Sequence, residues 1–157
     1  MKSLMVTLTV WVAGMFLTTV ALANDVDDVA EVKAAVQSYF TAINTGNTNA
    51  YIQVRMQEHS AFSRGELLTR FHSLAEQTKL LRTSFDAGEK GDLQLRNLEV
   101  KVYHDNTAVV TGYVVGTRPS PDGTKVSIRD QRTEVWIKQG AQWKQVHRHS
   151  SPLLLPQ

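Results

Sequence analysis

The chain has 157 residues, of which 42% are apolar, and it carries 17 Lys and Arg against 15 Asp and Glu, with no cysteine. A chain of this length buries about two-thirds of its unfolded surface in one domain, and without cysteine it has no disulfide to stabilise it. Because no run of Lys or Arg exceeds two residues, the charge pattern argues against nucleic acid as a partner.

The first 23 residues are typical of a cleaved secretory signal. Lys2 precedes an apolar stretch over residues 4–20, and Ala21-Leu22-Ala23 has the small residues of a cleavage site. We therefore expect residues 1–23 to be removed, which leaves a single domain over residues 24–157 in the periplasm or outside the cell. A retained membrane anchor is the alternative, and after cleavage no membrane contact is expected.

Apolar residues recur every three or four positions after residue 26, which predicts an amphipathic helix capped by Asn24 or Asp25. Gly46 should end this helix, and Thr48 or Asn49 can cap a short second helix that runs to about residue 56. The apolar stripe of the first helix comprises Val29, Val32, Val36, Tyr39, Phe40 and Ile43.

A brief extended piece over residues 59–62 leads to Ser63 and Glu66, which have the spacing of a capping box. This pair predicts a third helix that ends before the polar loop at residues 86–91. The buried stripe of that helix would be Leu67, Phe71, Leu74, Thr78 and Leu81.

After residue 91 the apolar period changes from that of a helix to that of a strand. Alternating residues predict a strand over residues 93–102, and further strands are predicted over residues 107–117, 124–138 and 143–151. Turns at residues 104–106, 119–123 and 139–142 join them into a meander. Three helices followed by a curved antiparallel sheet make an α+β fold, with the helices on one face of the sheet.

The last strand carries a row of polar side chains. Alternation along a strand predicts one shared face for Trp143, Gln145, His147, His149 and Ser151. Two imidazoles in register can act as acid, base or ligand, or they can bond buried polar groups and shape a wall or an interface. A metal would need a third ligand, for which Glu58, His59 and Glu134 lack diagnostic spacing, so we expect no metal site and no cofactor.

Three segments carry a resemblance to a known family: residues 39–51 (YFTAINTGNTNAY), Ala61-Phe62, and residues 133–156 (TEVWIKQGAQWKQVHRHSSPLLLP). The chain resembles the nuclear transport factor 2-like superfamily, its SnoaL-like members, and in particular the association (hub) domain of calcium/calmodulin-dependent protein kinase II. The resemblance implies a cone in which the curved sheet wraps the helices around an apolar cavity. It also implies that the outer sheet face forms dimers or larger rings.

Hub domains bind small carboxylates through inward arginines, and this chain departs from that pattern. Glu134 precedes Val135, and Ser150 follows His149, at positions that carry arginine in the family. The remaining strand arginines can offer a guanidinium to a carboxylate, but the same pattern fits solvated strand residues. These arginines are Arg129, Arg132 and Arg148.

Tyr39 on the first helix can point into the cone and donate a hydrogen bond to a ligand, or it can simply fill the core. Acid–base catalysis would add a carboxylate base, for which Glu134 and Glu58 are candidates. The catalytic candidates are therefore Tyr39, Glu134 and His147. The expected ligand-binding residues are Tyr39, Tyr113, Arg132, Glu134, His147 and His149.

The sequence leaves three functions open. We expect an exported protein that binds a small organic molecule in the cone cavity and forms a homo-oligomer, a dimer or larger. An isomerase- or hydrolase-like enzyme that uses the same cavity is the first alternative. A pure oligomerisation module without a ligand is the second. Fold analogy supplies most of this inference, and unrelated activities share such folds.

Overall fold

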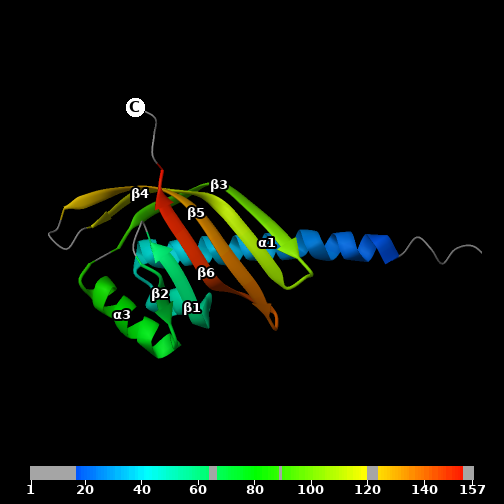
Figure 1. Ribbon diagram of the computed structural model, residues 1–157, viewed down its shortest axis with the longest axis horizontal. Helices are drawn as coiled ribbons and strands as arrows, with labels where there is room; N and C mark the ends of the chain where they lie inside the picture. Colours follow the sequence, from blue (N-terminus) through cyan, green and yellow to red (C-terminus); the bar gives the residue numbers. More distant parts are fainter. Residues whose placement is uncertain (1–16, 64–66, 89, 120–123, 154–157) are drawn as a thin grey trace, which may run out of the picture.

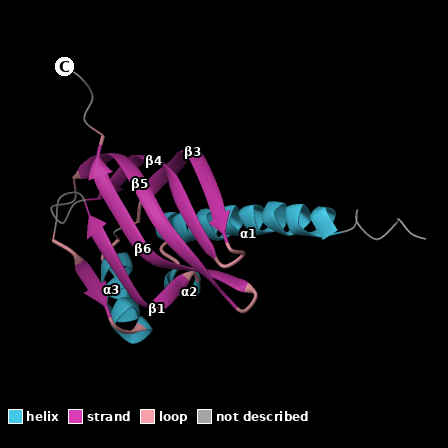
Figure 2. Ribbon diagram, turned by 45° about the vertical axis from the view of Figure 1, so that its right-hand side comes forward, coloured by secondary structure: helices cyan, strands magenta, loops and turns pink. Residues whose placement is uncertain are grey.

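Six strands form one curved sheet, and the long helix α1 runs along one of its faces (Figures 1 and 2). The computed structural model describes residues 17–63, 67–88, 90–119 and 124–153. The helices are α1 (Leu17–Thr45), α2 (Thr48–Gln53) and α3 (Leu74–Asp86). The strands are β1 (Arg55–Ser63), β2 (Thr69–Phe71), β3 (Asp92–Tyr103), β4 (Thr107–Pro119), β5 (Lys125–Gln139) and β6 (Gln142–Pro152).

The strand order is β2-β1-β6-β5-β4-β3. Strands β3 to β6 form the predicted antiparallel meander. Strand β1 then lies parallel to β6 and pairs on its other side with β2. The α+β fold is confirmed. Its core lies between α1 and the meander, where the buried stripe of α1 meets the inner face of β4 to β6, and it includes Val32, Val36, Tyr39, Phe40, Val110, Val114, Trp136 and Trp143.

Helix α1 begins earlier than predicted. We expected a cap at Asn24 or Asp25, but the helix already includes Leu17. Residues 17–24 contain neither proline nor glycine, so the helical hydrogen bonds can continue through them. The expected cleavage point after Ala23 therefore falls inside α1, and the export signal stays a prediction. Within the described residues, no helix is both long and apolar enough to cross a membrane.

Helix α3 starts later than predicted, because a different Ser-x-x-Glu pair caps it. The Ser73 hydroxyl accepts from the backbone N–H of Glu76 at 3.1 Å, and the Glu76 carboxylate accepts from the N–H of His72 at 3.2 Å. The proposed cap at Ser63 and Glu66 was wrong in placing a helix directly after it: Ser63 ends β1, and Glu66 lies outside the described residues. Residues 69–71 form β2 instead of a helical turn.

A β-bulge in β3 explains its uneven apolar spacing. The pairing with β4 shifts between Arg96 and Glu99, and Asn97 has a φ of 51°. The extra residue keeps Leu95 and Leu98, three positions apart, on the same inner face. The predicted turn at residues 104–106 is confirmed, with His104 and Asp105 both at positive φ, as a tight hairpin turn requires.

Gly116 in β4 cannot accept a side chain. Its φ is 145°, and an added Cβ would lie 1.9 Å from the backbone oxygen of Asp92 on β3. We expect Gly116→Ala to lower the free energy of unfolding by about 3 kcal/mol, because strain and a backbone clash act together. Urea denaturation measures this loss. Gly140→Ala is the matched control, since Gly140 also has positive φ (61°) but open space around it, so strain alone should cost about 1 kcal/mol. Equal losses would contradict the clash.

Candidate ligand-binding site

A β-bulge divides the polar row of β6 between the two faces of the sheet. Trp136 on β5 lies opposite Gln145, but the preceding Val135 lies opposite His147, so β6 has one extra residue at this point. Trp143 and Gln145 share a face, as predicted, and this face is the buried inner one. Beyond the bulge the alternation is reversed. The prediction of one continuous face was therefore wrong: Arg148 and Ser150 point inward, and the two histidines lie on the outer face.

The outer side of β6 carries the imidazoles in contact with β1. His147 Nδ1 lies 2.8 Å from the Ser60 hydroxyl oxygen, and the His149 ring lies 5.8 Å from the Phe62 ring. Burial lowers the pKa of His147, and the neighbouring His149 and Arg148 act in the same direction. The lowered pKa favours the neutral imidazole of His147 beside Ser60.

Tyr113 and His149 come together, but outside the cone. Both line an outer depression of about 530 Å³ on strands β3 to β6. Thr111, Gln131, Thr133 and Ser151 share its wall, and the Gln131 amide donates to the Ser151 hydroxyl at 3.0 Å. This surface, which we call the outer depression, is polar and lies on the face of the sheet opposite α1.

The interior holds a cavity of two adjoining lobes, which we call the inner cavity. The first lobe, about 260 Å³, lies against α3, and the second, about 210 Å³, lies against β4 and β5. Four residues line both lobes: Tyr39, Ile43, Arg118 and Arg148. The hollow between helices and sheet therefore exists, and its wall combines apolar side chains with arginines.

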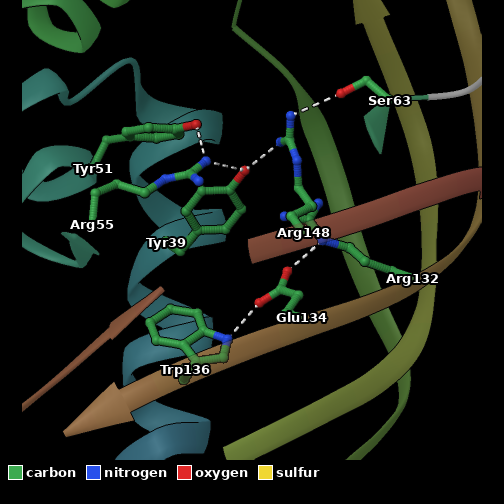
Figure 3. Close-up of polar contacts among 8 residues, drawn as sticks. All are labelled: Tyr39, Tyr51, Arg55, Ser63, Arg132, Glu134, Trp136 and Arg148. Carbon is green, nitrogen blue, oxygen red and sulfur yellow. Dashed lines mark hydrogen bonds and ion pairs between the residues drawn. The ribbon is translucent and has the colours of Figure 1, made fainter. Parts of the chain in front are cut away.

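Tyr39 is fully buried among three arginines from three strands (Figure 3). Its hydroxyl oxygen accepts from Arg55 Nη2 at 3.2 Å and from Arg148 Nη1 at 2.9 Å. The guanidinium of Arg132 lies 5.0 Å from the centre of the Tyr39 ring. Arg55 also donates to the Tyr51 hydroxyl. Arg148 is fixed further by donating to the Ser63 hydroxyl at 3.0 Å.

Glu134 serves as a counter-ion of this arginine cluster. One of its carboxylate oxygens is paired with Arg132, and the other accepts from the Trp136 indole at 2.7 Å. Burial opposes the charge on Arg132, but Glu134 and Tyr39 raise its pKa above the usual range. A carboxylate engaged at both oxygens is poorly placed to abstract a proton, so the geometry does not favour Glu134 as a catalytic base.

The arginines determine the ionisation of Tyr39. Burial alone raises the pKa of this phenol, but the positive charges of Arg132, Arg148 and Arg55 outweigh it and lower the pKa to about 6. Tyr51, also buried, behaves in the opposite way, because burial raises its pKa more than Arg55 lowers it. The pKa values of these two neighbouring tyrosines thus shift in opposite directions, because the surrounding guanidinium groups act more strongly on Tyr39 than on Tyr51.

His59 lies in the first lobe on β1, with its ring stacked on Phe71 at 4.7 Å. Burial lowers its pKa to about 3, and the charges of Arg55 and Arg148 act in the same direction. Among the described residues, no three His, Asp or Glu side chains lie close enough to share a metal ion. Glu58, His59 and Glu134 therefore do not assemble as ligands.

Residues 28–153 match the sequence model of the calcium/calmodulin dependent protein kinase II association domain. The chain belongs to this association domain family. No curated protein shows significant similarity to the chain, but many solved structures share its fold.

Three of these structures illustrate the similarity. A Streptomyces avermitilis protein of the nuclear transport factor 2-like family is 20% identical, with a TM-score of 0.67, and the match covers 83% of this chain and 99% of the other. The association domain of Caenorhabditis elegans calcium/calmodulin-dependent protein kinase II is 19% identical, with a TM-score of 0.64, and the match covers 81% of this chain and 97% of the other. A hub homology domain from Chlamydomonas reinhardtii is 25% identical, with a TM-score of 0.61 and coverage of 80% and 98%. The resemblance stated from the sequence is confirmed.

Sequence reasoning on this association domain missed Arg55. The predicted second helix ran through residue 56, whereas α2 ends at Gln53 and β1 begins at Arg55. Of the strand arginines that we considered, Arg132 and Arg148 reach the cavity, and Arg129 is exposed. The sequence signal that could have identified Arg55 is its place between two apolar residues, Val54 and Met56, which the structure shows to be partly buried. Glu134, the apparent departure from an arginine pocket, is itself part of the cluster.

We expect His59 to make the protein acid-sensitive. Below the ordinary imidazole pKa of 6.5 the unfolded chain takes up a proton that folded His59 refuses until about pH 3, so the free energy of unfolding should fall across this window. His59→Gln should reduce the fall, as measured by urea denaturation at a series of pH values. His72→Gln, at an exposed site, is the control. Identical pH profiles for the two variants would contradict the assignment.

Proposed function

We propose that this association domain binds a small organic anion, a carboxylate on an apolar body, in the inner cavity, and that copies of the chain associate through the outer face of the sheet. The single observation that carries the first part is the set of buried guanidinium groups whose hydrogen-bonding capacity the protein does not use up.

Several guanidinium nitrogens in the described part of the chain are buried without a hydrogen-bond partner. They are Arg55 Nε and Nη1, Arg132 Nη2 and Arg148 Nε. A buried donor that lacks an acceptor destabilises the protein, and more so when it is charged. An anion in the cavity supplies acceptors and negative charge at once, and arginine suits carboxylates because its planar fork matches their two oxygens.

The first lobe supports a ligand with an apolar body. Beside the arginines its wall carries Ile43, Leu80, Leu81, Phe71 and Phe85. Such a wall with a few convergent charged groups is typical of small-molecule sites. The cavity is small, which favours a compact aromatic or aliphatic acid over a large one.

We expect benzoate to bind to the protein and its neutral analogue benzamide to bind much more weakly, as measured by titration calorimetry. Arg148→Met should weaken benzoate binding at least about tenfold, the equivalent of one charge-assisted hydrogen bond. Arg55→Met should do the same.

Arg129→Met is the matched control, because it removes an exposed arginine from β5, and it should leave the affinity unchanged. If benzoate and shorter carboxylates such as acetate fail to bind to the wild-type protein, the proposed ligand class is wrong. Equal losses for Arg129→Met and Arg148→Met would mean that net charge, not the cavity, attracts the anion.

The outer face of the sheet supports self-association. Val109 on β4 and Val135 on β5 lie opposite each other. Both side chains face outward, because their neighbours Val110 and Trp136 are buried on the inner face. Phe62 and Tyr113 are 40% and 38% exposed on the same side. None of the three described helices covers this face in Figures 1 and 2. Membership in a family of association domains favours a second copy of the chain as its partner.

We expect Tyr113→Arg to lower the mass of the assembled protein in light scattering, because it places a charge in the middle of the outer face. Thr83→Arg is the control, since it adds the same charge at an exposed position of α3, away from the sheet. The proposal fails if the wild-type protein is monomeric, or if both variants keep its assembled mass.

A further inference from the structure

The hydroxyl oxygen of Tyr39 is placed as the acceptor of a cationic cluster. Arg55 and Arg148 both donate to it, at 3.2 and 2.9 Å. The Arg55 and Arg132 guanidinium groups also lie 4.9 and 5.0 Å from the centre of its ring. Hydrogen bonds from charged donors stabilise an ionised acceptor over a neutral one.

Positive charge around Tyr39 exceeds the negative charge of the nearby carboxylates. Among the described residues, four arginines but a single carboxylate, Asp130, line the inner cavity. Glu134 adds a second negative charge through its pair with Arg132. In a buried site such an excess of positive charge favours any group that can become negative.

The ionisable groups that face Tyr39 come from every neighbouring element except α3, β2 and β3, and β2 contributes Phe71 to the cavity. Helix α3 contributes the neutral side chains Gln77 and Ser84 to the cavity, and β3 contributes Leu93. The surrounding groups are Tyr51 on α2, Arg55 and His59 on β1, Arg118 on β4, Asp130, Arg132 and Glu134 on β5, and Arg148 on β6.

Two of these neighbours, His59 and Tyr51, have pKa values that are shifted away from neutral pH, so their titration does not mask that of Tyr39. The pKa of His59 is lowered to about 3, and that of Tyr51 is raised above its ordinary value. The pKa of Tyr39 itself, at about 6, lies just below neutrality.

We infer that Tyr39 is a resident phenolate of the inner cavity in the free protein, and that a bound organic anion takes over its guanidinium partners while the phenolate takes up a proton. The second half of this inference rests on the proposed function, and the first half does not.

The exchange balances in charge and atoms. In the free protein the Tyr39 oxygen carries the negative charge and accepts from Arg55 and Arg148. When a carboxylate enters and accepts from these arginines, the Tyr39 oxygen loses donors, and two anions would share one cluster. One proton from solvent then converts the phenolate to a phenol. The cluster keeps the same total charge, and no bond other than the new O–H is formed.

Ultraviolet absorbance of the folded protein tests the first half. The tyrosinate band should develop with the amplitude of one tyrosine and a midpoint near pH 6. It should be absent from Tyr39→Phe and retained in Tyr51→Phe, which removes the adjacent buried phenol.

If Tyr39→Phe does not fold, the Glu134→Gln variant tests the same inference. Because Glu134 raises the pKa of Tyr39, the midpoint of the tyrosinate band should move to lower pH in this variant. An unmoved midpoint, or no band below pH 8 at all, overturns the inference, with pH 8 chosen as about two units below the ordinary phenol pKa.

Calorimetric titration with benzoate tests the second half. In two buffers of different ionisation enthalpy, the heats should differ by the uptake of about one proton per benzoate at a pH above the midpoint. The affinity should fall about tenfold per pH unit in this range and become independent of pH in Tyr39→Phe.

The outcomes separate the two proposals. Benzoate binding without proton uptake overturns the linkage and leaves the proposed function standing. Failure of benzoate to bind, with the tyrosinate band present, overturns the proposed function and the linkage but supports the resident phenolate. Absence of the band overturns the whole inference, whatever the binding result.

Discussion

Mutual repulsion among buried guanidinium groups is the constraint to which the interior of this domain is adapted. Arg55, Arg132 and Arg148 come from three strands and meet around one residue of α1, Tyr39. Each has lost most of its contact with water, and the described negative groups do not match them in number. The protein tolerates this because the surrounding sheet and helix hold each side chain by an additional contact, such as those with Tyr51, Glu134 and Ser63. A polar network of this kind stabilises the fold only if its members are satisfied. Binding sites commonly show such a local conflict with stability, because the ligand resolves it.

One inserted residue lets β6 present a different kind of side chain on each face of the sheet. Without the bulge beside Val146, the alternation that buries Trp143 and Gln145 would also bring His147 inward and turn Arg148 outward. With the bulge, a single short segment supplies a guanidinium to the inner cavity and imidazoles to the outer face. The proposed ligand site and the proposed assembly surface are therefore one residue apart along the chain. A shift of this segment would move Arg148 in the inner cavity and the two imidazoles on the outer face together.

Much of this architecture could be predicted from the sequence, because it depends on local periodicity. The apolar stripe of α1, the alternation in β3 to β6 and the turn at His104 follow from side-chain spacing and turn chemistry alone. The errors arose where two local signals compete or where pairing decides. Two Ser-x-x-Glu sequences were available to cap a helix. Residues 69–71 pair with β1 as strand β2, so the helix begins only after Ser73. The bulge in β6 has no signal of its own, because it is defined by registration against β5. The same error inverted the positions of Arg148 and His147.

The roles of individual residues were harder to infer than the fold. Tyr39 was a candidate on the sequence, but only as one polar atom in an apolar stripe. Its significance comes from side chains that are distant in sequence, including Arg148, which is 109 positions away. Arg55 was concealed by a predicted helix that ended three residues too late. A charge cluster assembled from α1, β1, β5 and β6 is a property of the tertiary structure.

The parallel pairing of β1 with β6 bears on how the domain folds. Ser60 and His147, which touch across this pair, are separated by 87 positions. Closing so large a loop carries an entropic penalty, and proteins dominated by such non-local contacts fold slowly. The antiparallel meander can form earlier from neighbouring hairpins, whereas the junction of β1 and β6 needs β6, the last of the six described strands along the chain. During synthesis the cationic interior can therefore close only after β6 has left the ribosome, because β6 supplies Arg148.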